Sequence, residues 1–193
     1  MKTLTSLDDR QLVLSYRNGE SNALEQLVYR HKSKLFNYIY LQVKNKEAAE
    51  DIFQDTFCKI IDCLRNGRYN EEGKFIQWAM RIAQNLCIDH FRKQKTTPVV
   101  RISFDKETFE GLALADGGAD INIIRNQTYG KVRTMLDMLP PEQKEIIIMR
   151  HYADLKFKEI ASLLHCSLNT ALGRMRYGLI NLRKMMEVQS ATG

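Results

Sequence analysis

Residues 162–184 read SLLHCSLNTALGRMRYGLINLRK, and this stretch decides the fold of the C-terminal part of the chain. Its apolar residues recur at helical spacing on both sides of Ser167, whose hydroxyl can cap a helix by accepting a backbone N–H bond. Together with the preceding FKEIA, the stretch reads as a helix, a three-residue turn and a longer second helix. The sequence therefore predicts a helix-turn-helix.

The second helix of this motif has charge of one sign. Arg174, Arg176, Arg183 and Lys184 are basic, and the quoted stretch contains no acidic residue. A helix that needs only solubility usually mixes both signs, because opposite charges four residues apart stabilise one another. A one-signed face favours an anionic partner, with a helical hairpin whose basic residues are merely solvated as the alternative.

A helix-turn-helix needs a small core where its helices cross, and Ala161 lets them approach closely. The predicted core consists of Ile160, Leu163, Leu164, Cys166, Ala171, Met175 and Leu182. If the second helix enters a DNA major groove, its N-terminal half comes nearest to bases and phosphates. The residues expected at the DNA are Ser167, Asn169, Thr170, Leu172, Gly173, Arg174, Arg176 and Tyr177.

Helical periodicity covers two parts of the chain and fails between them. Residues 8–94 have apolar residues at helical spacing, with turn residues at Asn18-Gly19, at Asn45 and across 65–74, which predicts four helices. The pattern returns at Ile121, after a stretch that contains ADGGAD and reads as a tether. We predict an all-α protein with a four-helix domain at 1–95, a flexible linker at 96–122, a second small helical domain at 123–187 and a tail at 188–193.

The composition limits the classes of function. The chain has 193 residues and a net charge of +6, which suits a nucleic-acid or acidic partner. Its four cysteines are widely spaced without a C-x-x-C pair, which predicts reduced, mostly buried thiols and neither a metal site nor disulfides. No signal peptide or membrane-spanning apolar run is visible, so we expect a cytoplasmic protein without membrane insertion.

The predicted third helix has an acidic stripe opposite its apolar face. The stripe consists of Asp51, Gln54, Asp55, Cys58 and Asp62. Gln54 and Asp55 lie three and four residues after Asp51, and Cys58 and Asp62 follow Asp55 at further steps of three and four, which keeps side chains aligned along a helix. An acidic stripe repels DNA, so it favours a protein partner with a basic or mixed surface. A plain solvated face is the alternative.

The predicted fourth helix and the loop before it combine aromatic and basic residues. The set consists of Lys74, Phe75, Trp78, Arg81, Asn85, Phe91, Arg92, Lys93 and Lys95. Such a mixture suits unpaired bases, because rings stack on base faces for about 1 to 3 kcal/mol each while cations follow the backbone. Phe75, Trp78 and Phe91 could equally be core residues.

Three motifs together resemble the bacterial RNA polymerase sigma factors of the extracytoplasmic-function (ECF) type. They are AEDIFQDTFCKII, GKFIQWAMRIAQNLCIDHFRKQK and LPPEQKEIIIMRHYADLKFKEIASLLHCSLNTALGRMRYGLINLRK. The resemblance covers both predicted domains in the order of regions 2 and 4 of that family. It implies partners, namely core RNA polymerase, promoter DNA as duplex and as melted strand, and an anti-sigma protein as a further candidate.

The resemblance also assigns roles by position. It matches Asp51, Gln54 and Asp55 to the contact with the polymerase clamp helices, and the helix-turn-helix to the reader of the −35 element. It matches the fourth helix and its loop to the surface that binds the −10 element, where a base flips out of the stack. The residues expected at that element are Arg68, Tyr69, Asn70, Lys74, Phe75, Trp78, Arg81, Asn85, Arg92 and Lys93.

The chain departs from the family pattern in the helix-turn-helix. His165 stands where glycine is common in the turn, so its backbone must adopt a left-handed conformation or the turn must be modified. Leu172 and Gly173 replace a cation and a hydroxyl at positions expected to read bases. These changes remove hydrogen-bond donors, so a promoter sequence cannot be borrowed from other family members.

The sequence favours a transcription initiation factor that binds core polymerase, directs it to promoters and aids strand opening. It shows no nucleophile with a base, no phosphate-binding glycine loop and no metal-ligand set, so we expect neither an enzyme nor a cofactor. One alternative is a dimeric helix-turn-helix regulator that binds duplex DNA without polymerase. Another is an interaction protein whose first domain only binds a partner.

Overall fold

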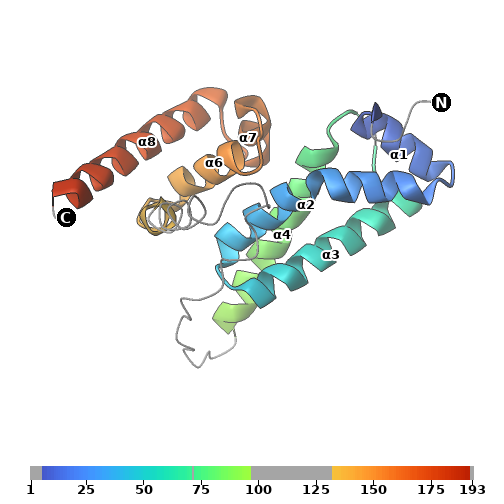
Figure 1. Cartoon of the computed structure of the whole chain (residues 1–193), viewed down its shortest axis with the longest axis horizontal. Helices are drawn as coiled ribbons and strands as arrows, with labels where there is room; N and C mark the ends of the chain where they lie inside the picture. The colour runs from blue at the N-terminus through green and yellow to red at the C-terminus, as the bar shows by residue number, and fades with distance from the viewer. Residues whose placement is uncertain (1–5, 71, 97–131, 192–193) are drawn as a thin grey trace, which may run out of the picture.

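The computed structural model describes residues 6–70, 72–96 and 132–191, and all regular secondary structure in these ranges is helical (Figure 1). This confirms the predicted all-α class. The helices are α1 (Asp9–Arg17), α2 (Ser21–Val43), α3 (Lys46–Arg65), α4 (Phe75–Thr96), a short segment at 132–137, α6 (Pro141–His151), α7 (Phe157–Leu163) and α8 (Leu168–Ala191).

The four helices α1 to α4 form the predicted N-terminal bundle, and local caps set their ends. Asp8 accepts the backbone N–H of Gln11 at 2.8 Å, while the Gln11 side chain accepts the backbone N–H of Asp8 at 3.1 Å, a reciprocal capping box at the start of α1. Asn45 caps α3 by accepting the N–H of Ala48 at 2.8 Å. The predicted breaks at Asn18-Gly19 and Asn45 are therefore confirmed.

The C-terminal helices form the predicted helix-turn-helix. The hydroxyl of Ser167 accepts the backbone N–H of Thr170 at 3.0 Å and so caps α8. His165 has a φ of 49°, which confirms that its backbone is left-handed in the turn. Ile160, Leu163, Ala171 and Met175 are buried in the core. Leu164, Cys166 and Leu182 complete it as partly buried residues packed against it.

Several sequence predictions fall partly or wholly outside the described residues. The linker expected at 96–122 does so except for Thr96, which ends α4. The expected tail at 188–193 begins inside a helix, because α8 continues to Ala191.

The expectation that the thiols are mostly buried is wrong, since Cys87 is buried, Cys58 is exposed, and Cys63 and Cys166 are half-buried; all four are free thiols.

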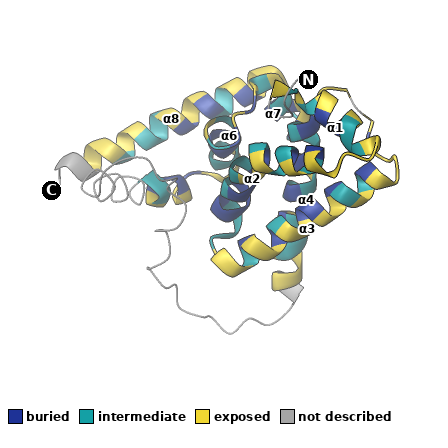
Figure 2. Cartoon of the chain, turned by 45° about the vertical axis from the view of Figure 1, so that its right-hand side comes forward, coloured by how far each residue is buried: buried dark blue, intermediate teal, exposed yellow. Residues whose placement is uncertain are grey.

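The bundle and the C-terminal helices lie against one another, with α6 and α7 beside α2 and α4 (Figures 1 and 2). The Arg133 guanidinium lies 4.4 Å from the centre of the Tyr40 ring and donates to the Tyr40 hydroxyl at 3.0 Å. Asp137 accepts from Lys44 of the bundle and from Lys144 of α6, each at 2.8 Å. Polar and charged contacts therefore join the two parts.

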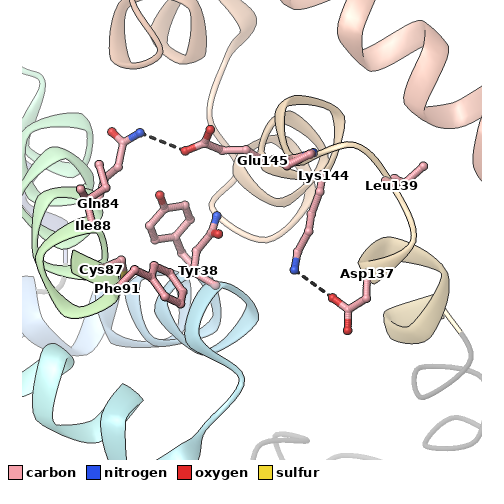
Figure 3. A pocket seen from close by; sticks show the side chains of 11 residues that line it. Tyr38, Gln84, Cys87, Ile88, Phe91, Asp137, Leu139, Lys144 and Glu145 are labelled. Carbon is pink, nitrogen blue, oxygen red and sulfur yellow. Dashed lines mark hydrogen bonds and ion pairs between the residues drawn. The ribbon is translucent and has the colours of Figure 1, made fainter. Parts of the chain in front are cut away.

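A pocket of about 330 Å³ opens at this junction (Figure 3). Gln84 of α4 donates to Glu145 of α6 at 2.9 Å across it. Burial raises the pKa of Glu145, against the lowering effect of the Gln84 hydrogen bond and of the Arg174 charge. Burial, with a further contribution from the Glu145 charge, also raises the pKa of the Cys87 thiol to about 12, so this thiol stays protonated and unreactive at neutral pH.

Candidate nucleic-acid and protein interfaces

The acidic stripe of α3 lies on the surface. Asp51, Gln54 and Asp55 are all exposed, and the stripe continues through exposed Cys58 and Asp62. The opposite face of α3 is buried through an apolar set made up of Ala49, Ile52, Phe57, Ile60 and Leu64. The helix is anchored by one face, and the predicted acidic stripe is exposed on the other.

A second stripe runs along α4. Lys74, Trp78, Arg81, Asn85 and Arg92 follow at steps of four, three, four and seven residues, which places them along one side of a helix. Trp78 is half-buried and the other four are exposed. The structure thus brings one aromatic ring and several polar or basic side chains together on one surface, which we call the α4 stripe.

Two of the aromatic residues expected at DNA lie in the core instead. Tyr69 is 4% exposed and Phe75 is 1% exposed. Their rings support Trp78, with centroid distances of 4.2 Å from Tyr69 and 5.9 Å from Phe75. Arg17 of α1 donates to the Tyr69 carbonyl and holds the loop in place. In this structure Tyr69 and Phe75 position Trp78 and leave it as the ring of this cluster that reaches the surface.

The loop before α4 turns with the help of glycine. Gly67 and Gly73 have φ values of 64° and 71°, a region that side chains disfavour. Arg68 and Asn70 are exposed in this loop. Glu72 lies within 3.4 Å of Asn70 Nδ2 and 3.1 Å of Lys74 Nζ, and this carboxylate reduces the positive charge at the start of the α4 stripe.

The N-terminal half of α8 presents a third surface, with alternating exposed and buried residues (Figure 2). The exposed residues of the predicted DNA-contacting set are Ser167, Asn169, Thr170, Leu172, Arg176 and Tyr177. Gly173 and Arg174 are half-buried, and the positive charge of Arg174 lowers the pKa of Glu145 on α6. Arg174 is therefore less accessible to a ligand than the exposed Arg176.

The contacts between the two parts of the chain were not predicted from the sequence. These contacts pair Gln84 with Glu145 and Arg133 with Tyr40. All four residues lie in segments that read as ordinary amphipathic helices, and their spacing does not indicate a contact with the other part of the chain. Glu145 follows Lys144 and stands at the polar edge of the apolar run that begins at Ile146, so its position in the sequence does not distinguish it from a solvated acid.

The described residues contain no group of three or more His, Cys, Asp or Glu side chains that could hold a metal ion. Within the same ranges, no helix is long and apolar enough to cross a bilayer.

Two family models match the chain, one over each part. Sigma-70 region 2 matches residues 27–97, which contain the α3 and α4 stripes, and Sigma-70, region 4 matches residues 129–172, which contain the turn and the start of α8. A dimeric helix-turn-helix regulator is therefore not favoured, because the similarity includes the N-terminal bundle as well as the helix-turn-helix.

Curated relatives and a solved structure agree with these matches. RNA polymerase sigma factor SigV of Bacillus subtilis is 32% identical over 159 residues, which cover 82% of this chain and 86% of that protein. ECF RNA polymerase sigma factor SigW of the same organism is 26% identical over 183 residues, covering 92% and 96%. The structure of CnrH in complex with the cytosolic domain of CnrY has a TM-score of 0.68 at 20% identity, covers 93% of this chain and 97% of that one, and shows the same fold. The chain thus belongs to the ECF-type RNA polymerase sigma factors, which are transcription initiation factors that bind core polymerase and direct it to promoters.

Proposed function

We propose that the three surfaces divide the work of initiation. The observation that supports this most directly is the placement of Trp78, whose ring rests on Tyr69 and Phe75 and stands in line with Arg81 and Asn85. A supported ring beside a cation and an amide suits an unpaired base, since the ring can stack while the polar groups bind the base edge or backbone. The α4 stripe then holds the melted −10 strand.

The acidic stripe of α3 is proposed to bind core polymerase. Asp51 and Asp55 are exposed on a helix whose opposite face is fixed in the bundle core, so docking needs no rearrangement of α3. Their charge excludes nucleic acid and selects a basic protein surface. The exposed N-terminal half of α8 reads the −35 element as duplex.

The protein performs no bond chemistry in this proposal and works in the cytoplasm with its polymerase. An anti-sigma protein is a further proposed partner, supported by the fold shared with CnrH, whose structure was solved with the cytosolic domain of CnrY. The linker at 96–122, which lies outside the described residues apart from Thr96, is proposed to act as a tether between the two domains.

The decisive experiment is reconstitution. Purified protein is mixed with core RNA polymerase that lacks any sigma factor, and the 5′ ends of transcripts from genomic DNA are sequenced. Discrete start sites that share two upstream elements are expected. Absence of both core binding and defined start sites would overturn the proposal.

The role of Trp78 has a separate test. Trp78→Ala is expected to reduce promoter opening, measured by permanganate reactivity of unpaired thymines, by about tenfold, since losing one stacked base costs about 1 to 3 kcal/mol. Binding to closed duplex is expected to stay within twofold, because stacking acts only after melting. Trp78→Phe keeps a ring and should retain most opening. Equal loss of opening and duplex binding would contradict the assignment.

A further inference from the structure

Two glycines of α8 differ in what the fold requires of them. A Cβ at Gly178 would lie 2.8 Å from Cδ1 of Ile147, so the packing of α8 on α6 explains that glycine. A Cβ at Gly173 would meet nothing within 4 Å, and Gly173 is not among the glycines with positive φ. Glycine inside a helix lowers helix stability relative to alanine. Neither packing nor backbone geometry explains Gly173.

Leu172, next to Gly173, is equally unexplained by the fold. It is 43% exposed, whereas the neighbouring apolar residues Ala171 and Met175 are 0% and 8% exposed. A single exposed leucine is ordinary on a protein surface. This leucine, however, lies in the middle of the face that Asn169 and Arg176 share, three residues after one and four before the other. An apolar side chain therefore occupies the centre of the proposed base-reading surface.

Other polar groups nearby are engaged within the protein. The Thr170 hydroxyl lies 2.8 Å from that of Ser167, whose oxygen also caps α8. Arg174 is half-buried, and its charge opposes the rise that burial causes in the pKa of Glu145. The outer face thus combines the Asn169 amide, the Arg176 guanidinium, the exposed Tyr177 ring, the Leu172 side chain and, at Gly173, a stretch of helix backbone without a side chain.

We propose that Leu172 reads the C5-methyl group of a thymine in the upstream duplex, and that Gly173 permits the close approach of α8 that this contact needs. Thymine is the base that presents an apolar group in the major groove, and apolar side chains are its natural contact there. Asn169 and Arg176, on either side of Leu172, can bind the neighbouring base edges or phosphates. This inference rests on the proposed reading of duplex DNA by α8.

The test removes single methyl groups from the DNA. The full chain, assembled with core polymerase, first selects its upstream element from a duplex library randomised in that region. Each thymine of the selected element is then replaced by deoxyuridine, which lacks only the C5-methyl. One replacement is expected to weaken wild-type binding about fourfold, the effect of burying one methyl-sized group. The same replacement should not change the affinity of Leu172→Ala for the duplex.

Leu179→Ala is the matched control. Leu179 lies two turns further along the same face of α8 and is 46% exposed, so its truncation removes a similar exposed side chain away from the proposed contact. In Leu179→Ala, replacing the contacted thymine by deoxyuridine should still weaken binding about fourfold. A methyl effect that persists in Leu172→Ala, or no methyl effect at any thymine, or a selected element without thymine, would overturn the inference while leaving duplex reading intact.

Gly173→Ala is an independent test, because it is expected to raise the stability of the protein and to lower its affinity for DNA. The midpoint of thermal unfolding should rise by about 2 to 4 °C, because alanine favours the helix. Affinity for the selected duplex should fall about tenfold, as expected for a methyl group forced into a packed contact. Unchanged affinity would overturn the role of Gly173 in close approach. Failure of the wild type to select any upstream sequence would overturn duplex reading itself, and with it this inference.

Discussion

At the scale of single residues, Asp9 is the clearest example of a charged side chain that the fold holds between fixed partners. Its carboxylate pairs with Arg30 at 2.7 Å and with His31 Nε2 at 2.8 Å, where α1 meets α2. Burial acts to raise the pKa of Asp9, but the hydrogen bonds and charges of His31 and Arg30 outweigh it and hold that pKa below 3.8. The ionised form is therefore stabilised in the folded protein.

Asp9→Asn is expected to lower the free energy of unfolding by about 1 to 3 kcal/mol at neutral pH, the usual range for hydrogen bonds to a charged group. The folded pKa lies below the unfolded one, so the contribution is fully present above pH 3.8 and is lost as the pH falls through the folded value. Urea unfolding of both proteins across pH checks this. A difference that stays constant down to pH 2 would contradict it.

His165 offers a stabilising substitution. Its φ of 49° is unfavourable for a residue with a side chain, although histidine tolerates it better than branched residues do. His165→Gly is expected to raise the free energy of unfolding by about 0.5 to 1 kcal/mol, since relief of the left-handed strain exceeds the entropy that glycine adds to the unfolded chain. His165→Val should destabilise. Thermal unfolding of the three proteins provides the comparison, and a less stable glycine variant would show that the imidazole itself contributes.

At the scale of elements, α3 separates a structural face from a binding face. Asp51→Lys and Asp55→Lys are each expected to weaken core polymerase binding about tenfold or more, because a cation replaces an anion opposite a basic surface. Their thermal unfolding should change little, because both positions are exposed. Glu25→Lys, at an exposed position on α2, makes the same charge change away from the stripe and should bind normally.

Co-purification with core polymerase at fixed salt measures this difference. Equal weakening by Glu25→Lys would show that net charge alone matters, and undiminished binding of Asp51→Lys and Asp55→Lys would remove α3 from the polymerase contact.

At the scale of the whole molecule, the two parts are in direct contact, whereas the promoter elements proposed for them are far apart. Elements centred near −10 and −35 are about 25 base pairs apart, or roughly 85 Å along B-DNA. Here Arg133 and Tyr40 hold the parts in direct contact. If α4 and α8 bind these elements as proposed, we expect the contacts between the parts to open when both elements are bound.

Asp137 is the centre of the charged contacts that must break. Asp137→Lys is expected to separate the two parts, because the new cation faces Lys44 and Lys144 in a half-buried site. The radius of gyration from small-angle X-ray scattering at low salt should increase. Asp154→Lys is the control, since the Lys34–Asp154 pair is more exposed and contributes little. An unchanged radius of gyration in Asp137→Lys would show that the remaining contacts, among them Arg133–Tyr40 and Gln84–Glu145, are enough to hold the parts together.

The sequence by itself determined the helices, their breaks, the turn at His165, the Ser167 cap and the stripe on α3. These follow from local rules, namely hydrophobic period, capping chemistry and glycine or asparagine at turns. The tertiary structure decided which rings are buried, since Tyr69 and Phe75 have the same character in sequence as Trp78, and only the packing of α1 and α4 around the loop distinguishes them. It also decided the partial burial of Arg174 and the contact between Gln84 and Glu145. Contacts between residues far apart in sequence depend on how completed helices pack, and the hydrophobic period of one helix does not identify the helix that packs against it.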